Sequence, residues 1–297
     1  MKEALISHIQ RFSSDDGPGI RTTVFFKGCS LHCAWCHNPE CLDLGIQLQF
    51  YEWRCTQCGA CVSICPSQAQ ELGGGRFIDR GKCRKCFQCV DACGTGSLQR
   101  SGRFMTIQDL VAEVIKDADY YQNSGGGVTL SGGEPLLQWE FCRELAQDLR
   151  QKEIHLAVDT AGFVSYESFE AVLPFIDLFL YDIKFYESVL HEKYTGYPNA
   201  LIKENLEKLI HAGATVIVRI PLIPGLHNEP ELEQVSRYLY GKKIEGVELL
   251  PYHDMGVHKY YSLGIEKPWL NKCRVEKREQ ANAIEIFKRC GIQTTFH

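Results

Sequence analysis

The distribution of cysteine constrains this chain more than any other feature of its sequence. The 297 residues include fifteen cysteines, and eleven of them fall into three short groups. Disulfides persist in oxidising compartments, and the first ten residues lack the basic and then apolar pattern of an export signal. We therefore expect a cytoplasmic protein whose thiols serve metal or redox chemistry rather than disulfides. The groups are Cys29, Cys33 and Cys36; Cys55, Cys58, Cys61 and Cys65; and Cys83, Cys86, Cys89 and Cys93.

The first cysteine group occupies an eight-residue stretch, residues 29–36, here called the cysteine loop. Three thiolates this close together can bind three irons of a cubane cluster from one side, which leaves the fourth iron open to a substrate. Zinc in structural sites has four ligands. Because His32, His37 or Cys41 could complete such a set, zinc remains an alternative on spacing alone.

The second and third cysteine groups share the spacing of bacterial ferredoxins that bind two [4Fe–4S] clusters. Pro66 follows the second group, as in those ferredoxins, whereas Gly94 follows the third. The fourth cysteine of each group there binds the other cluster. Structural zinc is the alternative, although this spacing is not usual for zinc. The predicted ligand sets are Cys55, Cys58, Cys61 and Cys93 for one cluster, and Cys83, Cys86, Cys89 and Cys65 for the other.

These two groups lie in a segment with few long apolar runs, residues 50–100, which the triglycine 73–75 divides. We predict an inserted module that folds around its metals, within a larger domain formed by residues 1–49 and 101–297. Four cysteines fall outside the groups, and we expect them to pack as small apolar residues. They are Cys41, Cys142, Cys273 and Cys290. Cys41 is a possible exception, because it lies only five residues beyond the cysteine loop.

Outside this insert, strand-like apolar runs alternate with helical patterns. The clearest helix begins at Thr106 with Asp109 as its capping partner, and others cover residues 200–211 and 275–290. This alternation predicts an α/β fold with a parallel sheet, either open or curled into a barrel, and ligands at the carboxyl ends of its strands. The predicted strands are residues 22–26, 128–131, 155–159, 178–182, 215–220 and 247–250.

Polar side chains gather at five of these strand ends. Each one alone could be a helix cap, a surface charge or a buried ion pair, but together they indicate a binding site. They are Ser131 to Glu134, Asp159 with Thr160, Asp182 with Lys184, Arg219 and His253.

The cysteine loop also resembles a known signature. Cys29, Cys33, Trp35 and Cys36 follow the pattern C-x3-C-x-aromatic-C, which is similar to that of the radical S-adenosylmethionine (SAM) superfamily. The resemblance implies a partial (β/α)6 TIM-like barrel, here with a bacterial-ferredoxin-like insert. It also implies that the open iron binds the amino and carboxylate groups of SAM, and that the reduced cluster cleaves SAM to a 5′-deoxyadenosyl radical.

Six further motifs, spread over nearly the whole chain, resemble the glycyl radical enzyme activating enzymes. The resemblance implies an oxidoreductase of anaerobic metabolism that removes hydrogen from a glycine α-carbon of a partner glycyl radical enzyme. A flavodoxin or a ferredoxin would donate the electron. The motifs are Asp16-Gly17-Pro18-Gly19-Ile20-Arg21, His37-Asn38-Pro39-Glu40, Ser131-Gly132-Gly133-Glu134-Pro135, Asp159-Thr160-Ala161-Gly162, Asp182-Ile183-Lys184 and Pro251-Tyr252-His253.

The resemblance further implies roles for individual residues. Asp16, Gly17, Gly19 and Arg21 would receive the partner's peptide. In the pyruvate formate-lyase activase, the position of Asp159 also helps to hold a monovalent cation beside a methionine, so a cation is a further candidate cofactor, although Tyr181 replaces that methionine. The residues expected around SAM are Trp35, His37, Asn38, Gly132, Gly133, Glu134, Asp159, Asp182, Lys184, Arg219 and His253.

Two other functions remain open. A radical SAM enzyme acting on a small molecule or an ordinary peptide would have the same barrel and cluster, and only the motifs at 16–21 and 37–38 argue against it. An iron–sulfur electron carrier would leave the open cysteine loop unexplained. A net charge of −5 and the lack of an apolar run of about eighteen residues disfavour nucleic acid and membrane partners.

Overall fold

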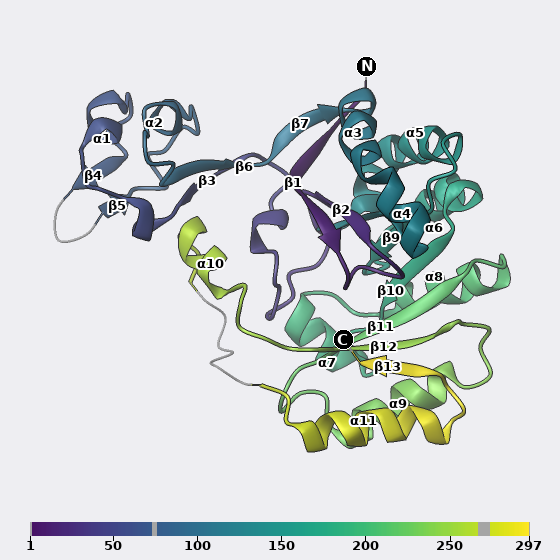
Figure 1. The fold of residues 1–297 in the computed structure, drawn as a ribbon. Helices are drawn as coiled ribbons and strands as arrows, with labels where there is room; N and C mark the ends of the chain where they lie inside the picture. Colours follow the sequence, from purple (N-terminus) through teal and green to yellow (C-terminus); the bar gives the residue numbers. More distant parts are fainter. Residues whose placement is uncertain (1, 73–75, 267–273, 297) are drawn as a thin grey trace.

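The computed structural model describes residues 2–72, 76–266 and 274–296 (Figure 1). The triglycine 73–75 and Cys273, on which two of the sequence predictions depend, lie outside these residues. The described chain forms a large α/β body with a smaller module to one side of it (Figure 1). None of the helices in these ranges is long and apolar enough to cross a lipid bilayer.

A nine-stranded sheet, in the order β13-β12-β11-β10-β9-β8-β2-β1-β7, forms the centre of the body. Strands β2 and β8 to β13 pair in parallel, whereas β1 and β7 extend one edge in antiparallel pairing. The predicted α/β class with a mostly parallel sheet is confirmed. The strands are β1 (Glu3–Ser13), β2 (Arg21–Phe26), β7 (Arg103–Thr106), β8 (Gly127–Gly132), β9 (Leu156–Thr160), β10 (Leu178–Asp182), β11 (Val216–Leu222), β12 (Gly246–Pro251) and β13 (Thr294–Phe296).

The six predicted strands correspond to β2 and β8 to β12, with ends that agree within two residues. Strands β1, β7 and β13 are additional. Register shifts and a positive φ at Phe12 interrupt the regular alternation of β1, and β13 is only three residues long. These three strands therefore carry little periodic signal.

Helices pack around the sheet and share one hydrophobic core with it, which includes Leu145 of α5, Leu206 of α8 and Val158 of β9. The predicted capping box forms between Thr106 and Asp109. The α-helices of the body are α3 (Ile107–Val114), α4 (Ala118–Ser124), α5 (Trp139–Arg150), α6 (Tyr166–Val172), α7 (Ser188–Thr195), α8 (Ala200–His211), α9 (Glu229–Leu239), α10 (Val257–Leu263) and α11 (Lys277–Arg289), with 3-10 turns at Pro39–Cys41, Ile115–Asp117, Pro135–Gln138 and Leu173–Phe175.

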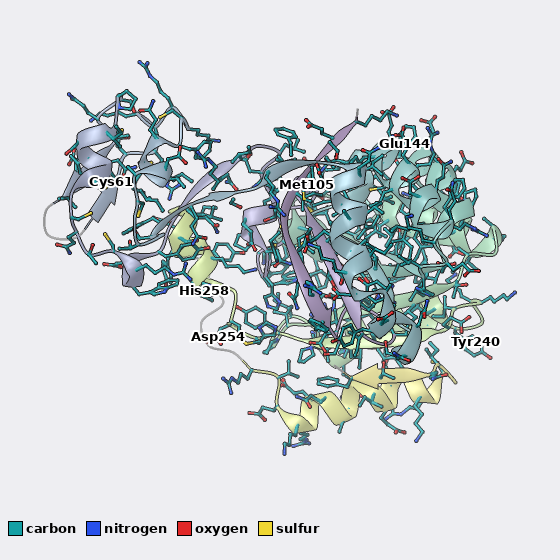
Figure 2. All side chains as sticks on the ribbon, turned by 45° about the horizontal axis from the view of Figure 1, so that its top comes forward. Cys61, Met105, Glu144, Tyr240, Asp254 and His258 are labelled. Carbon is teal, nitrogen blue, oxygen red and sulfur yellow. The ribbon has the colours of Figure 1, made fainter. Side chains whose placement is uncertain are left out.

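The smaller module contains the second and third cysteine groups. Strands β3 (Gln47–Phe50) and β6 (Leu98–Ser101) pair in antiparallel fashion where the chain enters and leaves it. The module has its own small core, which includes Cys61 and Cys89, and Figure 2 shows Cys61 well away from the body. Its other elements are a 3-10 turn (Glu52–Arg54), α1 (Ala60–Ile64), β4 (Gln70–Leu72), β5 (Arg76–Ile78) and α2 (Gln88–Asp91).

Candidate active site

A cavity of about 710 Å³ opens at the carboxyl ends of the parallel strands. Residues from the cysteine loop and from five strand ends line it, as expected for ligand sites in such sheets. Fourteen of the residues predicted from the sequence therefore meet in one place, although they are spread over more than two hundred positions. They are Asp16, Cys29, Cys33, Trp35, Cys36, His37, Asn38, Gly132, Gly133, Asp159, Asp182, Lys184, Arg219 and His253.

The cysteine loop is held against the end of β8 by backbone contacts that require glycine. The amide of Glu134 donates a 2.7 Å hydrogen bond to the carbonyl of Gly28. A Cβ at Gly133 would lie 2.1 Å from that same carbonyl oxygen and 2.7 Å from the carbonyl oxygen of Cys41. The two consecutive glycines thus let the turn after β8 approach the loop closely.

The three thiols of the loop are partly buried and lie close to one another. Burial raises the pKa of all three thiols. The neighbouring Cys33 thiol adds to this rise at Cys29 and at Cys36. The pKa of Cys36 reaches about 12. Lys184 opposes the rise at Cys33. Three adjacent thiols at a cavity wall beside a lysine ammonium fit the ligand set of a cubane with one open iron.

Two of the three residues that could complete a zinc site with the cysteine loop, Cys41 and His37, make other contacts in the structure. The Cys41 side chain is fully buried and does not line the cavity. The Nε2 atom of His37 is 2.9 Å from the carbonyl oxygen of His253, and the imidazole rings of the two residues are stacked. Across residues 2–72, 76–266 and 274–296, no three His, Cys, Asp or Glu side chains converge as ligands of a single metal ion.

Charged side chains form one part of the cavity wall, beside apolar residues such as Phe25 and Ile223. Lys184 donates to Asp182 at 2.6 Å, and Ser131 donates to Asp159 at 2.7 Å. Arg219 lies 3.6 Å from Asp159. Burial raises the pKa of Asp159 to about 6, Arg219 opposes the rise and Asp182 adds to it. The wall therefore presents both anionic and cationic groups, which suits a zwitterionic ligand such as an amino acid.

Glu248 lies on β12, beside Arg219 on the neighbouring strand β11, and accepts a 2.9 Å hydrogen bond from it. No motif in the sequence marked Glu248, because its partner lies twenty-nine positions away. Met255, His258 and Lys259 also line the cavity and were not predicted. The last two lie on α10, a helix of only seven residues, and such a short element gives little periodic signal.

Glu134 does not face the cavity as the resemblance implied. It is fully buried and accepts hydrogen bonds from the Thr160 hydroxyl and from the amides of Ala161 and Leu136. Its carboxylate therefore ties the turn after β8 to the end of β9. The side chain of Tyr181 also points away from the cavity, since its buried hydroxyl donates to the carbonyl of Ile202 on α8.

The segment predicted to receive the partner's peptide is only partly at the cavity. Asp16 lines it, and its carboxylate accepts from Ser13 at 2.5 Å and from Thr23 at 2.6 Å. Gly17 and Gly19 are not among the lining residues, and both have positive φ angles of the kind that glycine adopts readily.

Arg21 of the same segment is fully buried, so its side chain is not accessible to a peptide. Its guanidinium donates to the carbonyl of Val128 at 2.7 Å and to the hydroxyl of Thr129 at 2.6 Å. These bonds link β2 to β8, and the Arg21 side chain therefore stabilises the sheet. A sequence motif does not reveal whether an arginine faces inward.

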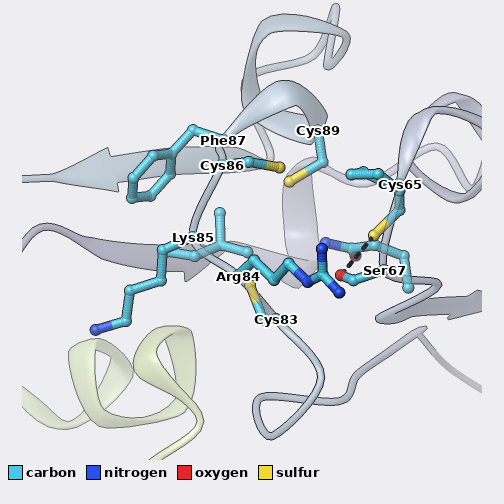
Figure 3. A pocket seen from close by; sticks show the side chains of 11 residues that line it. Cys65, Ser67, Cys83, Arg84, Lys85, Cys86, Phe87 and Cys89 are labelled. Atoms are coloured by element: carbon cyan, nitrogen blue, oxygen red, sulfur yellow. Dashed lines mark hydrogen bonds between the residues drawn. The ribbon is translucent and has the colours of Figure 1, made fainter.

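A pocket in the insert brings together four cysteines from two cysteine groups. Figure 3 shows the side chains of Cys83, Cys86 and Cys89 around it with Cys65, the last cysteine of the second group. Cys93 does not line this pocket; its sulfur lies 3.2 Å from the Ser97 hydroxyl. The grouping fits the crossed ligand set of a two-cluster ferredoxin.

Comparison with family models defines the class of this protein. Residues 80–238 match the model described as "Radical SAM superfamily", and residues 15–73 match the model described as "4Fe-4S single cluster domain". The second range includes the first two cysteine groups. A radical SAM methyltransferase from Sphaerobacter thermophilus has a related fold, with a TM-score of 0.58 at 16% identity over 98% of this chain and 76% of that one.

Sequence relatives define the family. The benzylsuccinate synthase activating enzyme of Thauera aromatica is 42% identical over 89% of this chain and 83% of its own. The trans-4-hydroxy-L-proline dehydratase activating enzyme of Clostridioides difficile is 43% identical over 86% of each chain. This chain belongs to the glycyl radical enzyme activating enzymes of the radical SAM superfamily. It activates a glycyl radical enzyme by radical SAM chemistry, and it requires SAM and [4Fe–4S] clusters.

Proposed function

We propose that the first cysteine group binds the cluster that cleaves SAM, with the open iron facing the cavity. The observation that carries this proposal is the meeting of Cys29, Cys33 and Cys36 with the charged strand ends around one cavity. The cluster, when bound, supplies the electron for cleavage of a carbon–sulfur bond. The protein's own residues hold SAM beside it, and this proximity supplies much of the rate.

The lining residues divide by chemistry. The backbone of Gly132 and Gly133 would accept from the amino group of SAM, and Lys184 would pair with its carboxylate. Asp159 and Asp182 lie where they can accept from hydroxyl groups of the ribose. The remaining residues proposed to contact SAM are Trp35, His37, Asn38, Arg219 and His253. Glu134 would act on SAM only indirectly, by fixing the glycine turn.

The insert, residues 50–100, is proposed to bind two further [4Fe–4S] clusters and to carry electrons from a flavodoxin or ferredoxin. Cys58 and Cys86 are solvent-exposed, so both proposed clusters lie near the surface where a donor protein can approach. The ligands would be Cys55, Cys58, Cys61 and Cys93 for one cluster and Cys65, Cys83, Cys86 and Cys89 for the other.

The protein substrate is proposed to be a glycyl radical enzyme whose glycine-containing loop enters the cavity beside Asp16. The position of Asp16 supports this, since it lines the same cavity of about 710 Å³ as the cysteine loop. The named relatives act on different enzymes, including a synthase and a dehydratase, so they do not select one partner.

Metal analysis tests this proposal. After anaerobic reconstitution we expect about twelve irons per chain, at four per [4Fe–4S] cluster, with equal sulfide. A saturated value of about four irons, or stoichiometric zinc, would contradict the two clusters in the insert. Formation of 5′-deoxyadenosine from SAM after reduction would separate the enzyme from a simple electron carrier.

A further inference from the structure

Helix α10 lies between the insert and the cysteine loop, where it contacts β3 on one side and the turn Pro39–Cys41 on the other. Figure 1 shows it beside β3, and Figure 2 shows His258, one of its residues, between the insert and the body. The ring of His258 is 6.2 Å from that of Trp53 in the insert. None of the cluster ligands proposed above lies on this helix.

One face of α10 holds the end of the cysteine loop. The hydroxyl of Tyr260 donates a 2.8 Å hydrogen bond to the backbone carbonyl of Cys36, and the Tyr260 side chain is almost fully buried. The adjacent Lys259 donates to Asn38 at 2.8 Å and to Glu40 at 2.7 Å. The helix therefore fixes both the last cysteine of the loop and the residues that follow it.

The last turn of α10 is bonded to the insert. Ser262 is two residues from Tyr260, which turns it about 200° around the helix axis. Its hydroxyl accepts from Gln49 at 3.2 Å, and its carbonyl accepts from Arg80 at 3.1 Å. Arg80 also donates to the carbonyl of Leu48 at 2.6 Å. Leu48, on β3 where the chain enters the insert, packs in the small core there and lines the cysteine pocket, so α10 is linked to the metal-binding part of the insert.

We infer that α10 is a brace that fixes the cysteine loop relative to the insert, and that Tyr260 is a positioning residue for the cluster bound there. The inference rests on the proposed ligation by Cys29, Cys33 and Cys36. Hydrogen bonds and solvent access around a cluster set its reduction potential. The Tyr260 hydroxyl directs the positive end of its dipole toward the loop, which favours the more negative, reduced form of the cluster.

Removing this hydroxyl tests the role of Tyr260. In Tyr260→Phe we expect an unchanged iron content. At a fixed potential, the ratio of reduced to oxidised cluster should be lower than in the wild type, by at most about tenfold, because only the difference in the strength of this bond between the two oxidation states changes the ratio. Potentiometric titration of the SAM-dependent part of the electron paramagnetic resonance signal measures this ratio. Tyr261→Phe is the matched control, because Tyr261 is the next residue on the helix and is 66% exposed.

A second variant tests the link to the insert. Arg80→Gln breaks the bonds to Ser262 and Leu48 without touching the loop, and it should lower the same ratio by a smaller factor. It also keeps the test usable if Tyr260→Phe does not fold. The brace is overturned if Tyr260→Phe titrates like Tyr261→Phe, or if Arg80→Gln titrates like the wild type. A wild-type protein without any SAM-dependent signal would instead overturn the proposed ligation, and the brace with it.

Discussion

The hydroxyl of Thr160 lies 2.9 Å from both carboxylate oxygens of Glu134, and both side chains are buried. This contact joins the ends of β8 and β9, two of the five strands whose carboxyl ends line the cavity. Together with the Ala161 amide, it fixes the turn that carries Gly132 and Gly133. Glu134 belongs to a motif that resembles a SAM site. Its carboxylate thus contributes to that site by positioning the backbone of the glycine turn.

Glu134 should make stability depend on pH. Burial raises its pKa from 4.5 to about 7, although hydrogen bonds from Thr160, Leu136 and Ala161 oppose the rise. The fold therefore binds this proton more tightly than the unfolded chain does. The resulting stabilisation is fully present below pH 4.5 and is lost as the pH rises through about 7.

Glu134→Gln removes the titrating group and keeps its shape. Between about pH 5.5 and about pH 8, the wild type should lose about 2 kcal/mol of stability relative to this variant. Anaerobic thermal unfolding of both proteins across this range measures the difference. Parallel pH profiles of the two proteins would show that Glu134 is ionised in the fold at all these pH values.

Gly133 should not tolerate a side chain. In Gly133→Ala the new methyl group would meet the backbone carbonyls of Gly28 and Cys41, which cannot rotate away. We expect a loss of about 1–3 kcal/mol or more and poor iron retention by the cysteine loop. Gly94→Ala is the control, because a Cβ there meets no atom within 4 Å. Equal unfolding temperatures and iron contents for the two variants would contradict this packing.

The sequence predicted the parallel part of the fold well, because strands β8 to β12 are short, largely apolar runs with polar residues near their carboxyl ends. It also brought Asp159, Asp182 and Lys184 to one site, since the carboxyl ends of parallel strands share one edge of a sheet. These features depend on local patterns, which a single sequence contains.

Other features depend on contacts between distant residues, and these were not predictable. Tyr260 and Cys36 are 224 positions apart, and no periodicity links them. Arg21 and Glu134 belong to motifs that suggested contact with ligands, but a motif does not show on which side of the backbone a side chain lies. Both side chains proved to be buried.

Two cysteine substitutions should separate the roles of the clusters. Cys33→Ala removes a ligand of the proposed SAM-cleaving cluster, so formation of 5′-deoxyadenosine should cease. Cys58→Ala alters only the insert, and it should retain some cleavage with a strong artificial reductant, because ferredoxin-type clusters carry electrons. Quantifying 5′-deoxyadenosine in both variants tests this. A folded Cys58→Ala protein that keeps its other clusters and is wholly inactive would give the insert a more direct role.

Asp16 should matter more for the protein substrate than for SAM. Its carboxylate lines the cavity and is held there by hydrogen bonds from Ser13 and Thr23. Asp16→Ala should therefore weaken the radical formed on the partner several-fold and largely spare cleavage of SAM in the absence of the partner. Equal losses in the two assays would place Asp16 with the SAM site instead.

The most direct measurement is electron paramagnetic resonance of the partner protein. The reduced enzyme, SAM and a candidate glycyl radical enzyme would be incubated together under anaerobic conditions. We expect a glycine-centred doublet on the partner, together with 5′-deoxyadenosine, and neither product without SAM. Abundant 5′-deoxyadenosine with no radical on any candidate partner would contradict transfer to a protein glycine and would favour a small-molecule substrate.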